Sequence, residues 1–152
     1  MRKTLSIVVL MLCVGTTLFS QQIQPLTASE IYGELKQLQS FTSVLYVAAH
    51  PDDENTRLLS WLARGKHIRT AYLSLTRGDG GQNILGSEQG AALGLIRTNE
   101  LLAARRLDGA EQFFSRAIDF GYSKNAKETL NQWVADVITE DIMEVFKRYR
   151  PD

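Results

Sequence analysis

A histidine and three carboxylates lie close together in the hexapeptide AHPDDE, which runs from Ala49 to Glu54. Imidazole nitrogen and carboxylate oxygen are ligands that suit zinc, and His50 and Asp53 are near enough on one turn to reach a single divalent cation. A second carboxylate of the turn, left off the metal, could then take a proton from a bound water molecule. One interpretation of the hexapeptide is therefore a metal-dependent hydrolytic site.

The same residues also allow a structural interpretation. Asp52 or Asp53 could cap the N-terminus of a following helix, where a carboxylate suits the positive end of the helix dipole. His50 is a poor capping residue, so capping does not explain it. A catalytic zinc ion normally has three protein ligands, and the only other histidine, His67, falls at the start of an expected strand, away from the site. Spacing alone leaves both interpretations open.

Apolar runs and glycines predict the elements that must position the hexapeptide. A continuous apolar, β-favouring run predicts a buried strand that ends where the hexapeptide begins. Five glycines in the fourteen residues from Arg77 to Gly90 predict a long loop. The expected strands are at 43–49, 67–76 and within 110–117, and the expected helices are at 27–39, 53–65, 91–109 and, as one long amphipathic helix stopped by Pro151, 127–149.

This order of elements predicts an α/β fold, with a Rossmann-like parallel sheet and helices on both faces. Sites in such sheets form outside the carboxyl ends of the strands. The hexapeptide follows the first expected strand, and TRGDGG, from Thr76 to Gly81, follows the second. The last residues given are RPD, Arg150 to Asp152, at a point where the pattern would place another strand. We therefore expect the sheet to be incomplete in this chain.

The two motifs together resemble the PIG-L/LmbE-like N-acetylglucosaminyl deacetylase family. The resemblance covers residues 43–152, the amino-terminal part of that family's domain. It implies that His50 and Asp53 bind Zn²⁺ and that Asp52 is the general base, in the removal of an acetyl group from an N-acetylated amino sugar or related N-acetyl substrate. It also implies a third ligand, a histidine beyond Asp152, so we expect the 152-residue chain by itself to be inactive.

Arg97 is the remaining candidate, because it lies at the edge of the apolar face of the helix expected at 91–109. One interpretation is an ion pair with Glu100, one helical turn away. The other, similar to the family's pattern of an arginine in this helix, is contact with a hydroxyl or phosphate group of a substrate. The sequence leaves both open.

The first twenty residues have the layout of a secretory signal peptide. Arg2 and Lys3 precede an apolar stretch that turns polar after Ser20, so we expect export to the periplasm or the extracellular space. A retained membrane anchor is the alternative, although the run is short for a span. Without residues 1–20 the chain has 15 basic and 17 acidic residues, and its one cysteine, Cys13, is gone. A nearly neutral chain gives no support to a nucleic-acid partner.

The organisation we expect is therefore a signal peptide at 1–20, a leading amphipathic helix and linker at 21–42, and the deacetylase portion at 43–152, with no stable membrane span after removal of the signal. The expected partner is a small-molecule or glycan substrate. Two other functions stay open, namely an exported non-catalytic carbohydrate-binding domain and another metal-dependent hydrolase, for example one acting on phosphoesters. A histidine in the loop after a further strand would favour the enzyme.

Overall fold

The computed structural model describes residues 25–152. The expected signal peptide therefore lies outside the described residues. In the described part of the chain, no helix is both long enough and apolar enough to cross a membrane.

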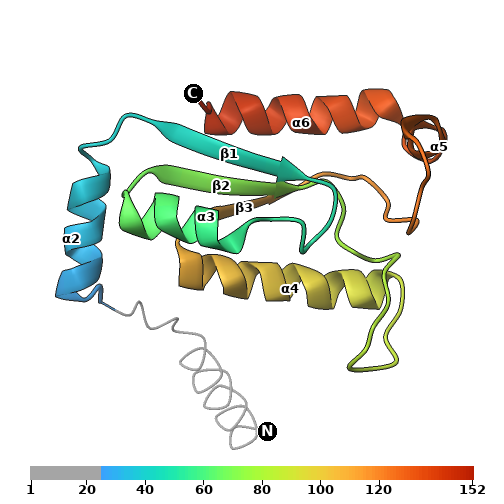
Figure 1. Cartoon of the computed structure of the whole chain (residues 1–152), viewed down its shortest axis with the longest axis horizontal. Coiled ribbons are helices and arrows are strands. Elements are labelled where there is room, and N and C mark those ends of the chain that lie inside the picture. Colours follow the sequence, from blue (N-terminus) through green and yellow to red (C-terminus); the bar gives the residue numbers. More distant parts are fainter. Residues whose placement is uncertain (1–24) are drawn as a thin grey trace, which may run out of the picture. The chain divides into compact units, whose positions relative to one another are not determined.

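The centre of the fold is a sheet of three parallel strands in the order β1-β2-β3 (Figure 1). These are β1 (Ser43–Ala48), β2 (Arg69–Ser74) and β3 (Glu111–Phe114). Parallel strands need long crossover connections, and helices supply them here. All three strands predicted from the sequence are confirmed, including the short third one.

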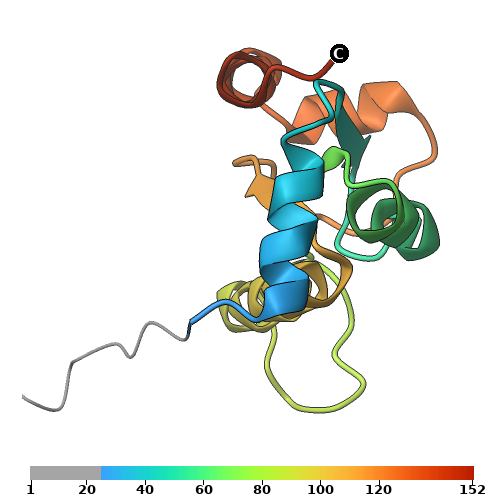
Figure 2. The same cartoon turned by 90° about the vertical axis from the view of Figure 1, so that its left-hand side faces the viewer.

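Helices cover both faces of this sheet, as Figures 1 and 2 show. On one face lie α3 (Thr56–Ser60), which continues as a π-helical turn η1 (Trp61–Gly65), and α4 (Ala91–Asp108). On the other face lies α6 (Ala135–Tyr149). The observed architecture confirms the predicted α/β fold.

The core forms on both sides of β2, the middle strand, whose successive side chains point to opposite faces. Ala71 and Leu73 pack with α6, in a cluster that includes Val145 and Tyr149. Tyr72 points the other way, into a cluster with Leu59 of α3 and Leu101 of α4. Full burial of a leucine or valine side chain stabilises a fold by about 1.5–3 kcal/mol. The carboxyl end of the sheet is thus fixed from both faces.

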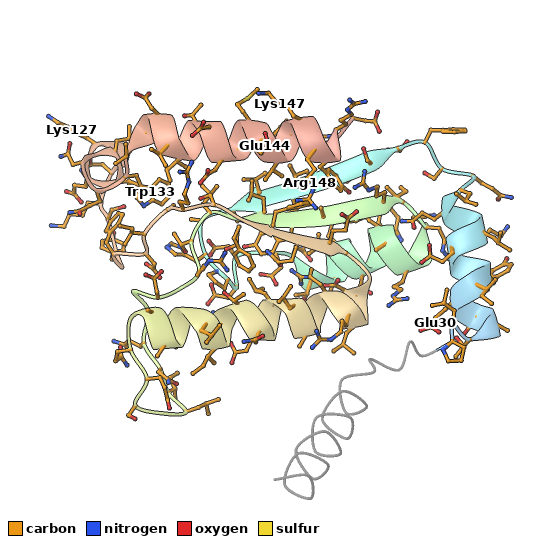
Figure 3. The ribbon with its side chains drawn as sticks, turned by 180° about the vertical axis from the view of Figure 1, so that it is seen from behind. Glu30, Lys127, Trp133, Glu144, Lys147 and Arg148 are labelled. Carbon is orange, nitrogen blue, oxygen red and sulfur yellow. The ribbon has the colours of Figure 1, made fainter. Side chains whose placement is uncertain are left out.

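The prediction of one long helix at 127–149 is wrong, because two helices occupy this segment: α5 (Ala126–Gln132) and α6. Trp133, labelled in Figure 3, interrupts them with an extended backbone. Its Nε1 donates a hydrogen bond of 2.9 Å to the carbonyl oxygen of Ile118, and its ring packs edge-on against Phe120. These contacts with the loop after β3 stop α5, although the helical periodicity of the sequence continues through the break.

The helix expected at 27–39 is α2 (Ala28–Gln37), and a capping box forms at its start. The Thr27 backbone N donates to Glu30 Oε2 at 2.7 Å, and the Glu30 backbone N donates to Thr27 Oγ1 at 3.3 Å. The domain boundary at residue 43 stays a prediction.

Candidate functional site

The hexapeptide forms a tight turn directly after β1, at the carboxyl end of the sheet. The carbonyl oxygen of His50 lies at the centre of the turn. It accepts hydrogen bonds from the backbone N of Asp52 at 3.0 Å and of Asp53 at 3.4 Å. In return, the His50 backbone N donates to Asp53 Oδ2 at 2.9 Å. These reciprocal bonds hold His50 and Asp53 on the same side of the turn.

The side chains of His50 and Asp53 meet in a geometry that suits one cation. His50 Nδ1 lies 3.3 Å from Asp53 Oδ2, and both side chains are partly exposed. Two ligands placed 2.0–2.2 Å from a tetrahedral zinc ion lie about 3.3–3.6 Å apart. The pair therefore fits two neighbouring positions in a zinc coordination sphere.

Asp119, which the sequence analysis did not select, lies beside the same histidine. Its Oδ1 is 3.7 Å from His50 Nε2, and its side chain is buried. The same Oδ1 accepts the Gly121 backbone N at 2.9 Å, which fixes the carboxylate in the loop after β3. A position just past a parallel strand was the signal that could have identified Asp119.

Asp53 and Asp119 face opposite ring nitrogens of His50, so they do not converge on one point. Within residues 25–152, no group of three or more histidine, cysteine or acidic residues could hold a metal ion. The described residues thus offer two ligands for a cation rather than a complete set.

Asp52 and Arg97 form a second pair at the turn. The Asp52 side chain is 70% exposed, and its Oδ2 lies 3.3 Å from Arg97 Nη2. Arg97 also donates to the Pro51 carbonyl oxygen, and its Nε lies 3.4 Å from Glu100. The expected Arg97–Glu100 ion pair is therefore present, but the same guanidinium also supports the turn. Contact of Arg97 with a substrate stays a prediction.

Neither aspartate caps the helix that follows the turn. The N-cap of α3 is Asn55, whose side-chain oxygen accepts the Leu58 backbone N at 3.0 Å. The capping interpretation of Asp52 and Asp53 is thus excluded. The carboxylates of Asp52 and Asp53 therefore do not serve as the N-cap of α3.

Glu54 has the opposite environment from its two neighbours, because its side chain is only 5% exposed. Its Oε1 accepts from Arg105 Nη2 at 3.0 Å, and Arg105 Nε donates to Asp108 Oδ2 at 2.9 Å. The other oxygen, Oε2, is buried and has no hydrogen-bond partner among residues 25–152. Glu54 thus has a structural role, because it connects the turn to Arg105 of α4.

A buried tyrosine supports the turn from below. The hydroxyl of Tyr72, in the middle of β2, donates to the His50 carbonyl oxygen. Burial raises the pKa of Tyr72 above its usual value, so the hydroxyl keeps its proton and remains a donor. This contact could not be predicted from the sequence, because a tyrosine in a β-favouring run fits equally well as a core residue.

The glycine loop TRGDGG fits closely against both neighbouring loops. A Cβ on Gly78, whose φ is +70°, would lie 3.1 Å from Pro51 Cγ, and a Cβ on Gly80 would lie 2.0 Å from the Asp119 carbonyl oxygen. Only glycine permits this approach without a shift of the backbone. The motif therefore lets the loops after all three strands meet at one place. A cavity of about 360 Å³ lies between the turn and α4, and its lining includes Asp52, Glu54, Arg97 and Glu100.

Comparison with known proteins agrees with this arrangement. The model of the PIG-L family, described as GlcNAc-PI de-N-acetylase, matches residues 45–152. No curated protein matches the chain significantly.

Two solved structures are similar in fold. N,N'-diacetylchitobiose deacetylase from Pyrococcus horikoshii has a TM-score of 0.54 and 18% identity, with 86% of this chain and 49% of that chain covered. GalB, the 4-carboxy-2-hydroxymuconate hydratase from Pseudomonas putida, has a TM-score of 0.51 and 24% identity. The match covers 73% of this chain and 45% of the GalB chain. The chain thus spans about half the length of these relatives.

Proposed function

The chain belongs to the PIG-L family, and on this premise we propose that it carries two metal ligands and the general base of a zinc-dependent N-deacetylase. The observation that carries the proposal is the 3.3 Å separation of His50 Nδ1 and Asp53 Oδ2. The capping of α3 by Asn55 supports it, because Asp52 and Asp53 are not needed to cap the start of the helix.

In this proposal each residue of the turn has a separate task. His50 and Asp53 would hold Zn²⁺, which when bound polarises an amide carbonyl and lowers the pKa of a water molecule. Asp52 would accept a proton from that water and later return it to the departing amine. The water oxygen forms a bond to the acetyl carbon and the C–N bond breaks, so the products are acetate and a free amine.

Arg97 would hold Asp52 in place for this proton transfer. Its guanidinium contacts both the carboxylate of Asp52 and the carbonyl of Pro51 next to it. The Asp52 carboxylate is nevertheless exposed, so a substrate could approach it. A direct contact of Arg97 with a substrate hydroxyl belongs to the same proposal.

The proposed substrate is an N-acetylated amino sugar or a related N-acetyl compound. The family description, GlcNAc-PI de-N-acetylase, and the similarity in fold to a diacetylchitobiose deacetylase support this class. Export to the periplasm or extracellular space is proposed from residues 1–20 alone. The hydratase GalB shares the fold, so a reaction other than amide hydrolysis is one outcome that the experiment must detect.

The experiment uses protein expressed from its complete reading frame, with zinc supplied, and compares wild type with Asp53→Asn and Asp52→Asn. We expect about one zinc ion per chain in wild type and Asp52→Asn, and loss of zinc in Asp53→Asn, which keeps an acceptor for the His50 amide. Acetate release from N,N'-diacetylchitobiose should fall about 10²–10⁴-fold in Asp52→Asn. Asp136→Asn, an exposed change in α6, is the control and should behave as wild type.

Three results would contradict the proposal in different ways. A wild-type protein that binds no zinc would remove the metal site and favour an exported carbohydrate-binding domain. Zinc binding without acetate release, but with turnover of a phosphoester or hydration of a double bond, would replace the reaction. Full activity in zinc-loaded Asp52→Asn would remove Asp52 as the base.

A further inference from the structure

We propose that Tyr72 is a positioning residue for the metal site, because its buried hydroxyl fixes the turn that presents His50 and Asp53. This inference rests on the proposed function and adds to it a residue from the middle of the sheet. Tyr72 does not touch the reacting atoms and acts only through the backbone of His50.

The first step is the convergence of donors on one oxygen. The His50 carbonyl accepts the amides of Asp52 and Asp53, and it also accepts the hydroxyl of Tyr72. The two amides belong to the turn itself and move with it. The hydroxyl is the one of these three donors that comes from the rigid sheet, so it sets the position of the turn relative to the core.

The second step is that the ring of Tyr72 cannot easily move. Its side chain is fully buried between the sheet and the helices α3 and α4. The ring of Tyr46 packs against it edge-on, with centroids 5.9 Å apart, and the guanidinium of Arg105 lies 5.5 Å from its centroid. A donor on so constrained a ring loses little conformational freedom when it binds the turn.

The third step links Tyr72 to the far end of the hexapeptide. Arg105, which lies over the Tyr72 ring, also binds Glu54 Oε1 at 3.0 Å. One buried guanidinium therefore contacts both the tyrosine that holds His50 and the carboxylate that follows Asp53. The turn is fixed at its first and last functional positions, and the side chains of Asp52 and Asp53 lie between these two fixed points.

Tyr149 provides a matched control within the same sheet. It is equally buried, on the opposite face, and its hydroxyl donates to the Val44 carbonyl oxygen at 3.3 Å. Val44 lies near the amino end of β1, whereas His50 follows its carboxyl end. Both hydroxyls bind a backbone carbonyl of the same chain segment, but only that of Tyr72 touches the turn.

The test compares Tyr72→Phe and Tyr149→Phe with wild type, in protein from the complete reading frame. The affinity for Zn²⁺ is measured by competition with a chromophoric chelator, the environment of the site by the visible spectrum of the Co²⁺-loaded protein, and the stability by thermal unfolding. We expect the zinc Kd of Tyr72→Phe to rise about 10-fold, with a changed cobalt spectrum, since loss of a residue that orients a ligand typically costs 10–100-fold in affinity. Tyr149→Phe should keep the wild-type Kd and spectrum while losing a similar amount of stability.

A Tyr72→Phe protein with the wild-type Kd and cobalt spectrum would overturn the inference and leave the proposed function intact. Equal weakening of zinc binding in both variants would also overturn it, because the effect would then follow general stability. A wild-type protein that binds no zinc would overturn the proposed function, and this inference with it.

Discussion

Two arginines of this chain, Arg105 and Arg116, each bind two carboxylates, but in opposite surroundings. Arg105 lies on α4 between Glu54 and Asp108, and its side chain is only 4% exposed. All three side chains of this cluster are buried, and one oxygen of Glu54 has no hydrogen-bond partner in the described part of the chain. Charges removed from water in this way are costly unless they remain paired.

Arg116, in the loop after β3, binds Glu140 and Asp141 of α6, and its side chain is 60% exposed. Water and salt screen such pairs, and most contribute 0–1 kcal/mol. Each arginine has two carboxylate partners, so the two clusters differ mainly in burial. We therefore expect burial to determine how much each cluster contributes to stability. The buried cluster fixes the hexapeptide to α4. The exposed cluster connects a loop to α6 but contributes little to the free energy of unfolding.

The largest effect is expected for Arg105→Met. Removal of the guanidinium leaves the carboxylates of Glu54 and Asp108 buried without a cation, which should lower the free energy of unfolding by about 3–5 kcal/mol. Urea unfolding of the protein at pH 7 measures this difference. Arg106→Met, at the exposed neighbouring position, is the control and should stay within about 0.5 kcal/mol of wild type. A loss below about 1 kcal/mol for Arg105→Met would show that the two clusters are energetically alike.

A second contrast, between a helix cap and an exposed ion pair, exists within the turn, and Asn55→Ala tests it. Asn55 caps α3, so its replacement should cost about 1 kcal/mol. Asp52→Ala removes only an exposed contact with Arg97, so it should cost less than about 0.5 kcal/mol. Thermal unfolding of both variants under identical conditions checks the order. A larger loss in Asp52→Ala would show that the exposed carboxylate, rather than the asparagine, supports the start of the helix.

The sequence was sufficient to predict the sheet and the place of the turn, because both depend on local patterns. Apolar runs mark β1 and β2, and the loops that follow parallel strands gather at one edge. The cap of α3 was ambiguous for a physical reason. Asp52, Asp53 and Asn55 can all cap a helix, and only packing of the apolar face chooses the residue at which the helix begins.

Contacts between distant segments could not be predicted from local patterns. The Glu54–Arg105 pair joins residues 51 positions apart, and the bond from Tyr72 to His50 joins a strand to the turn after another strand. Trp133 breaks a periodic helix because it binds Ile118 in another loop. Such pairings depend on which elements lie side by side, and no property of either segment alone specifies them.

A small effect is also expected at the exposed cluster, for Asp141→Asn. Asp141 Oδ2 accepts the Arg116 backbone N at 2.7 Å, and Oδ1 accepts Arg116 Nε at 2.8 Å. These hydrogen bonds hold the pKa of Asp141 below its usual value. A carboxyl whose pKa is lower in the folded state stabilises the protein above its unfolded pKa of about 4, and this contribution is lost as the pH falls through the folded value.

Asp141→Asn should therefore lower the free energy of unfolding by about 0.5 kcal/mol at pH 7 and low salt. The difference from wild type should shrink as the pH falls below about 4, where the wild-type carboxyl becomes neutral, and it should shrink in about 1 M salt at pH 7. The penalty of Arg105→Met should persist in the same salt, because its partners are buried. Urea unfolding at both pH values and both salt concentrations makes the comparison. If both penalties fell equally with salt, burial would not be what separates the two clusters.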